Sequence, residues 1–306
     1  MVNITMIGTG GNVPSHKRFC SSMFINYKGK KILIDCGEGT QVSMKTLGCG
    51  FKDIDLILIT HLHGDHINGL LGLLSTMGNA EKRNILTIVG PVGIKKAISA
   101  MMVLWEGLPY RLRIIENPGG PFSIDEEIFN EIEISTIALK HSTECLGYSL
   151  YFKRNRSFDV NKALENSVPK YLWKNLQSGK TFYIDDIKYD PEMVLGSSRK
   201  GIKVSFITDT RPISSIPDFI RESDLFVCEA MYGDEADISK AVKNKHMLFR
   251  EAATLAKNGN VKKLLLTHFS PSIEKPEDFI DNAKNIFANT TVAYDGIRIS
   301  IPYPED

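Results

Sequence analysis

The pattern of apolar and polar positions predicts short buried strands separated by glycine-rich turns, most densely in the first 60 residues. Apolar runs bounded by Gly, Asn or Asp are typical of such strands. After His66, apolar residues recur at helical spacing and predict a helix that ends near Gly78. Strands are predicted over residues 2–7, 22–27, 31–35, 55–60, 86–89, 132–139, 147–152, 203–208, 225–229, 263–267 and 292–294, and further helices over 92–104, 248–257 and 279–287.

Strands followed by helices in both halves of the chain predict an α/β fold with helices packed outside sheets. Apolar periodicity weakens between residues 153 and 200, which indicates an inserted segment or surface arm. The 306 residues are 42% hydrophobic and 24% charged, a composition that excludes disordered, collagen-like and coiled-coil chains. No signal sequence and no apolar stretch of about 20 residues occurs, so we expect a cytoplasmic protein without a membrane span.

The charges nearly balance, with a net charge of +1, and give no global sign of nucleic-acid binding. Residues 153–180, however, hold seven basic and two acidic side chains, a local net charge of +5 against −4 for the remainder. Basic residues attract phosphates, and Tyr171 and Trp173 are suited to stack on bases or to brace the arm. Composition alone fits a solvated charged segment equally well.

The cluster with the clearest chemistry is His61, His63, Asp65 and His66, where a predicted buried strand stops and a helix begins. Imidazole nitrogens and a carboxylate suit Zn²⁺ or a related divalent ion. Three merely solvated histidines are the alternative, but the preceding apolar strand counts against it. The five cysteines are scattered and form no Cys-x-x-Cys pair, which favours reduced thiols and leaves metal binding to histidine and carboxylate.

The stretch His61-Leu62-His63-Gly64-Asp65-His66 resembles the His-x-His-x-Asp-His signature of the metallo-β-lactamase superfamily. Four further segments match the superfamily in the expected order. Asp35 in ILIDCGEGTQ corresponds to the aspartate that supports the metal-binding loop in that superfamily. The remaining matches correspond to metal ligands, His141 in LKHSTECLGYSL, Asp209 in SFITDTRP and His268 in LLLTHFSP. Taken singly, each of these three ligands fits a structural role better. The resemblance implies a four-layer αββα sandwich that holds two metals between its two sheets.

The same resemblance implies a division of the ligands between two ions. One ion would be held by His61, His63 and His141, the other by Asp65, His66 and His268, with Asp209 bridging the two. A carboxylate can bridge two ions about 3.5 to 4 Å apart. We therefore expect two Zn²⁺ per subunit, with Mn²⁺ or another divalent ion also compatible with these ligands.

Within the superfamily, the chain resembles the short form of tRNase Z over nearly its whole length. The opening ITMIGTGGNVPSHKRFCSSMFI, the turn GEGTQ and the block VLGSSRKGIKVSFITDTRP carry the likeness. The basic arm lies where that family inserts its flexible, tRNA-gripping exosite. We therefore expect one domain over residues 1–306 with an exosite arm at 153–195, precursor tRNA as partner and a homodimer.

The resemblance also implies an acid–base pair, which is His246 in NKHMLFREAATLA with Glu229 in LFVCEAMYGDE. The family patterns His-Glu-Ala-Thr and His-Ser-Thr read Cys-Glu-Ala-Met and His-Met-Leu here, so neighbouring hydrogen-bonding groups are replaced. A water-facing residue near a helix start is the alternative for His246. Substrate contacts are expected from Arg18 in the N-terminal loop and from four arm residues, Arg154, Arg156, Lys170 and Lys174.

These features together predict a metal-dependent endoribonuclease that removes the 3′ trailer of precursor tRNA and leaves a 3′-hydroxyl. In this mechanism, metal-activated water attacks the phosphorus with Asp65 orienting it or accepting its proton, and His246 protonates the leaving 3′-oxygen. One alternative is a phosphodiesterase of the same fold that acts on small phosphodiesters or cyclic nucleotides. The other is a non-catalytic, metal-stabilised RNA-binding protein.

Overall fold

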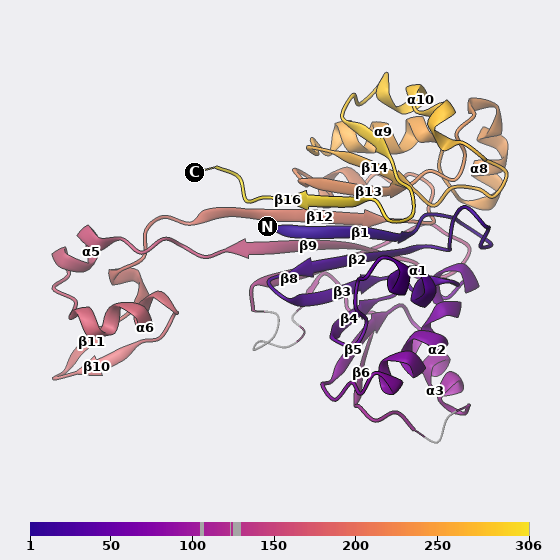
Figure 1. Cartoon of the computed structure of the whole chain (residues 1–306). Helices are drawn as coiled ribbons and strands as arrows, with labels where there is room; N and C mark the ends of the chain where they lie inside the picture. Colours follow the sequence, from indigo (N-terminus) through magenta and orange to yellow (C-terminus); the bar gives the residue numbers. More distant parts are fainter. Residues whose placement is uncertain (105–106, 123, 125–129, 306) are drawn as a thin grey trace. The chain divides into compact units, whose positions relative to one another are not determined.

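The computed structural model describes all residues except 105–106, 123, 125–129 and 306. The chain divides into two compact units, residues 1–152 with 202–302 and residues 153–201 with 303–306. In the described residues, the first unit contains two seven-stranded sheets and the second a two-stranded hairpin (Figure 1).

The first sheet is antiparallel at one edge and parallel from β3 to β6. Helices cover one of its faces, where Leu33, Ile57 and Ile88 pack against buried leucines of the longest helix. The strands in sheet order are β16 (Arg298–Ile301), β1 (Val2–Gly8), β2 (Ser22–Tyr27), β3 (Lys30–Ile34), β4 (Ile54–Leu58), β5 (Leu86–Gly90) and β6 (Leu112–Glu116), and the helices are α1 (Thr40–Thr46), α2 (Gly64–Asn79) and α3 (Ile94–Met102).

The second sheet is parallel from β12 to β15 and antiparallel from β7 to β9. Phe226 and Leu264 face helices α7 (Ile216–Phe219), α9 (Phe249–Asn258) and α10 (Asp281–Lys284). Helix α8 (Ile238–Asn244) precedes α9. The strands in sheet order are β15 (Thr290–Val292), β14 (Leu264–Thr267), β13 (Leu225–Glu229), β12 (Arg199–Ile207), β9 (Leu146–Arg154), β8 (Ile132–Ala138) and β7 (Pro121–Phe122).

The two sheets face each other. Tyr27 of β2 packs against Phe152 of β9 with ring centroids 4.9 Å apart. The Tyr148 hydroxyl of β9 donates to the Ile59 carbonyl at 2.8 Å. Because consecutive residues of the central strands are buried on alternate faces, each sheet contacts helices on one side and the other sheet on the other. The predicted four-layer αββα sandwich is therefore confirmed.

The second unit has a small core of its own. Ala163 of α5 (Val160–Glu165) packs with Leu176 of α6 (Trp173–Gln177) and with Val194. The Trp173 indole donates to the Val168 carbonyl at 2.9 Å and contacts Phe158, so Trp173 braces the arm. Strands β10 (Phe182–Ile184) and β11 (Ile187–Tyr189) form the hairpin.

The C-terminal third departs from the predicted elements. The helix expected over 279–287 is a short 3₁₀ turn, Pro276–Phe279, followed by the four-residue α10. The strand expected over 292–294 lies at Thr290–Val292. The edge strand β16 escaped prediction because none of its residues is fully buried and its apolar signal is correspondingly weak. No helix in the described ranges is both long and apolar enough to cross a bilayer.

Candidate active site

The histidine motif occupies the turn between β4 and α2, as predicted. His63 has extended backbone and caps α2, whose first turn carries Asp65 and His66. His61 and His66 are fully buried, whereas His63 and Asp65 are half-buried. The turn therefore presents four ligand-type side chains with two different degrees of solvent access.

Three further site residues lie within two positions of a strand end and have left-handed backbone. They are Asp35 after β3 (φ 58°), Asp209 after β12 (φ 48°) and His268 after β14 (φ 59°). Asp and His tolerate this conformation better than most residues do, and such residues cluster at functional sites. The sharp turns let three strand ends contribute side chains to one place.

The predicted metal ligands converge in two groups. The ligand atoms of His61, His63, His141 and Asp209 lie within 4.8 Å of one another, and so do those of Asp65, His66 and His268. Asp209 lies between the groups. Its Oδ2 is 3.6 Å from the Nε2 atoms of His61 and His141, and its Oδ1 is 3.3 Å from His66 Nε2 and 3.1 Å from His268 Nε2.

The surroundings of the ligands fit metal binding. Asp35 is fully buried, accepts from the Thr60 backbone at 2.8 Å and lies 2.8 Å from His66 Nδ1. The Thr60 hydroxyl lies 3.1 Å from His61 Nδ1. These contacts hold the His66 ring with its Nδ1–H donating to the Asp35 carboxylate and its Nε2 facing the other ligands. Nitrogen and carboxylate donors that share one bridging carboxylate suit a dinuclear metal site.

The histidines of the cluster differ in the direction of their pKa shifts. Burial lowers the pKa of His61, and the nearby His66 lowers it further. Burial opposes the charge on His66 as well, but Asp209 and Asp35 raise its pKa well above the usual value. Burial alone would raise the pKa of Asp209, yet His268, His66 and His61 hold it well below its usual range. A divalent cation would therefore displace a proton from His66 on binding.

His246 and Glu229 form the expected pair. His246 Nδ1 lies 3.2 Å from Glu229 Oε2, and the fully buried carboxylate also accepts from the backbone of Thr210 at 2.6 Å and of Met247 at 3.1 Å. Burial lowers the pKa of His246, but Glu229 more than compensates and raises it to about 9. His246 also stacks on His268 with ring centroids 5.5 Å apart. Because Nδ1 faces Glu229, Nε2 is the atom available to a substrate.

A half-buried ion pair that the sequence did not predict fixes the backbone around His246. The Arg211 guanidinium donates to the His246 carbonyl at 2.5 Å and pairs with Glu251. Glu251 in turn accepts from the Leu248 backbone at 2.9 Å, where α9 begins without a hydroxyl cap. A second interaction links the backbone next to His246 to that of a metal ligand, because the Lys245 ammonium donates to the His141 carbonyl at 2.8 Å. The only feature of the sequence that points to Arg211 is its position two residues after the ligand Asp209.

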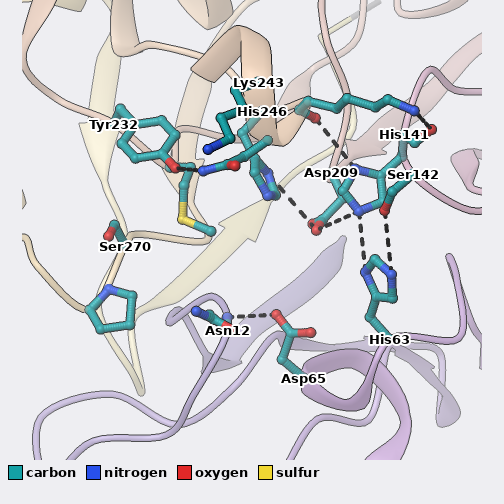
Figure 2. A pocket seen from close by; sticks show the side chains of 14 residues that line it. Asn12, His63, Asp65, His141, Ser142, Asp209, Tyr232, Lys243, His246 and Ser270 are labelled. Carbon is teal, nitrogen blue, oxygen red and sulfur yellow. Dashed lines mark hydrogen bonds and ion pairs between the residues drawn. The ribbon is translucent and has the colours of Figure 1, made fainter. Parts of the chain in front are cut away.

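A cavity of about 510 Å³ is lined by ligands such as His63, His141 and Asp209 and by His246 (Figure 2). His246, Tyr232 and Lys243 lie on one side of Asp209, and Asn12 and Asp65 lie on the other. The Asn12 backbone donates to Asp65 Oδ2 at 2.6 Å, an interaction that nothing in the sequence predicted.

The predicted substrate contacts have other partners in the structure. The Arg18 guanidinium donates to the Ile273 carbonyl and lies over the Phe269 ring. In the arm, Arg154 donates to the Pro304 carbonyl and Arg156 pairs with Glu192. Two other predicted contacts, Lys170 and Lys174, are exposed.

The chain is similar over its full length to curated proteins named ribonuclease Z. One from Clostridioides difficile (strain 630) is 63% identical over 305 residues, covering 100% of both chains. The chain belongs to the ribonuclease Z family. Another ribonuclease Z, from Alkaliphilus oremlandii (strain OhILAs), is 50% identical with 99% of each chain covered. Residues 2–194 match the family model of anti-Pycsar protein Apyc1, so the chain also falls within the family that this model defines.

A solved structure supports the same assignment. The crystal structure of human tRNase Z, short form, is 25% identical, covers 98% of this chain and 99% of its own, and superposes with a TM-score of 0.69. The predicted family and fold are confirmed by these relatives. The match to the Apyc1 model ends at residue 194, before Asp209, whereas the similarity to the C. difficile ribonuclease Z covers the whole chain.

Proposed function

We propose that the seven converging ligands hold two Zn²⁺ and that His246, backed by Glu229, acts as the general acid. As a member of the ribonuclease Z family, the chain is a metal-dependent endoribonuclease of tRNA 3′ processing. The observation that carries the residue assignment is the shared carboxylate of Asp209 between two groups of histidines. Bound ions would stabilise charge on the phosphoryl oxygens and lower the pKa of water.

The chain's own residues divide the proton transfers. The Asn12 backbone donates to Asp65 Oδ2, and in this proposal the Asp65 carboxylate accepts a proton from the attacking water. His246 is charged at neutral pH because of Glu229, so its Nε2 proton is available to the leaving 3′-oxygen. The P–O3′ bond breaks as the water oxygen bonds to phosphorus. The products are a tRNA 3′-hydroxyl and a 5′-phosphorylated trailer.

The arm provides the second part of the proposal. Exposed Lys170 and Lys174 are adjacent in sequence to Tyr171, which is 69% exposed, and a cationic surface with an exposed aromatic ring suits RNA. Residues 153–195 would then serve as the exosite inserted in the single domain. The positive charges of Arg18, Arg154 and Arg156 would add to the attraction of the RNA phosphates.

The family resemblance further supports a homodimer, and the five unpaired cysteines support a cytoplasmic location. Light scattering coupled to gel filtration tests the first, and cell fractionation tests the second. A monomer at micromolar concentration would refute the dimer.

The residue assignment is tested with two substrates. Zn²⁺-loaded protein should cut precursor tRNA directly after the discriminator base, and His63→Ala should abolish cleavage. His246→Ala should slow precursor cleavage by roughly 100- to 10,000-fold. It should hardly affect bis(p-nitrophenyl) phosphate, because p-nitrophenolate leaves without a proton. Equal loss on both substrates would refute the role of His246, and an active His63→Ala would refute the metal site.

A further inference from the structure

Two cavities reach the metal ligands, and their chemistry differs. The first, of about 510 Å³, is lined by His246, Lys243 and Lys245 as well as by ligands. The second, of about 460 Å³, shares Asn12, His63 and Asp65 with the first. Beyond these shared residues it is lined by Glu38 and Asn68 among others and by no lysine or arginine.

The second cavity continues along α2. A third cavity, of about 390 Å³, shares Pro14, Glu38 and Asn68 with it. The walls of this third cavity include Phe19, Val42 of α1 and two glycines of α2. We call the second and third cavities together the α2 groove. It begins at the metal ligands and offers apolar surface together with carboxylates and side-chain amides, but no lysine or arginine.

The position of the acid fixes the polarity of an RNA strand in the site. A group that protonates the leaving 3′-oxygen must lie within hydrogen-bond reach of it. That oxygen belongs to the last retained nucleotide of the tRNA, so this nucleotide must occupy the cavity that contains His246. Lys243 and Lys245 in the same cavity suit the phosphates of the retained strand.

We propose that the α2 groove binds the first nucleotides of the trailer. This inference rests on the proposed function of His246. In an in-line displacement, the attacking water, the phosphorus and the leaving 3′-oxygen lie on one line, which ends at His246. The trailer is joined to the same phosphorus through its 5′-oxygen, which lies off this line. The α2 groove adjoins the phosphorus site through Asp65 and His63. In the view of Figure 2, His246 lies above the level of the Asp209 carboxylate and Asp65 and Asn12 lie below it.

The lining of the α2 groove suits bases better than phosphates. Phe19, Pro14 and Val42 offer surfaces on which bases can stack. Glu38 can accept hydrogen bonds from base amino groups, and Asn68 can both donate and accept. The groove is lined by no lysine or arginine that could hold the phosphates beyond the scissile one, so the rest of the cleaved trailer is bound weakly.

Crosslinking tests the polarity without relying on turnover. Two precursor RNAs carry 4-thiouridine, one at the discriminator base and one at the second trailer nucleotide. Each is irradiated with the Zn²⁺-loaded His246→Ala variant, and the labelled peptides are mapped. The trailer probe should label peptides from residues 12–19, 38–42 or 68–72, and the discriminator probe those from 231–245. The reverse pattern, or labelling of 231–245 by both probes, overturns the inference.

A matched pair of variants adds a kinetic test. Val42 is 53% exposed and Val103, directly after α3, is 82% exposed, so aspartate at either position is compatible with folding. Val42→Asp should raise KM severalfold for a precursor with a long trailer but not for one with a one-nucleotide trailer, whereas Val103→Asp should change neither. An equal effect of Val42→Asp on both precursors refutes the groove. Failure of the wild-type protein to cut either precursor would instead refute the proposed function.

Discussion

Replacing Gly11 by alanine would press a methyl group into the ring of His268. A Cβ at position 11 would lie 2.6 Å from Cε1 and 2.9 Å from Nδ1 and Nε2 of that ring. Carbon atoms in contact prefer about 3.5 to 4.0 Å, so the imidazole must move by about 1 Å. Among the described residues, His268 Nδ1 has no hydrogen-bond partner, so packing against Gly11 has a large part in holding the ring.

A shift of this size should weaken the metal held by Asp65, His66 and His268 by roughly 10- to 100-fold and slow cleavage by about 100-fold. Metal affinity is measured by competition with a chromophoric chelator, and cleavage with precursor tRNA. Gly119→Ala is the control, because nothing lies within 4 Å of a Cβ there. If Gly11→Ala retains both metals and full activity, the N-terminal loop does not position His268 and the reasoning is refuted.

Three other predictions follow from the site and the arm. Arg211→Met should slow precursor cleavage roughly 100-fold through misplacement of His246, with Arg211→Lys less affected; p-nitrophenyl ester hydrolysis should stay near wild type, and a parallel loss there would contradict a positioning role. Zn²⁺ affinity should fall as pH is lowered from about 9 to about 6, because His66, whose pKa is raised, must release its proton; a flat profile by chelator competition would contradict this. Deleting residues 154–178 should cripple precursor cleavage and spare the ester, whereas loss of both would mark the arm as structural.

The sequence predicted the order of the ligands and the layers because both rest on local patterns. The motif around His63 and the buried strands are readable from neighbouring positions. The left-handed backbone of Asp35, Asp209 and His268 was not predictable, since Asp and His adopt that conformation only when long-range contacts require it.

Contacts between residues far apart in the sequence were also not predictable. Arg211 and Glu251 are 40 positions apart, and no periodicity connects them. Apolar periodicity is weak in the arm because its elements are short, yet they enclose a core of five buried residues. Short helices give little periodic signal even where they pack well.

The last residues of the chain belong to the arm. Tyr303 donates to the Lys153 carbonyl at 2.9 Å, and Arg154 donates to the Pro304 carbonyl while its guanidinium lies over the Tyr303 ring. Removing residues 303–306 would therefore loosen the root of the arm while leaving every metal ligand in place. An affinity tag fused to the C-terminus would begin beside that root, whereas one at the N-terminus would precede β1. For measurements of tRNA binding, a tag at the N-terminus is therefore preferable, because a C-terminal tag could disturb the arm.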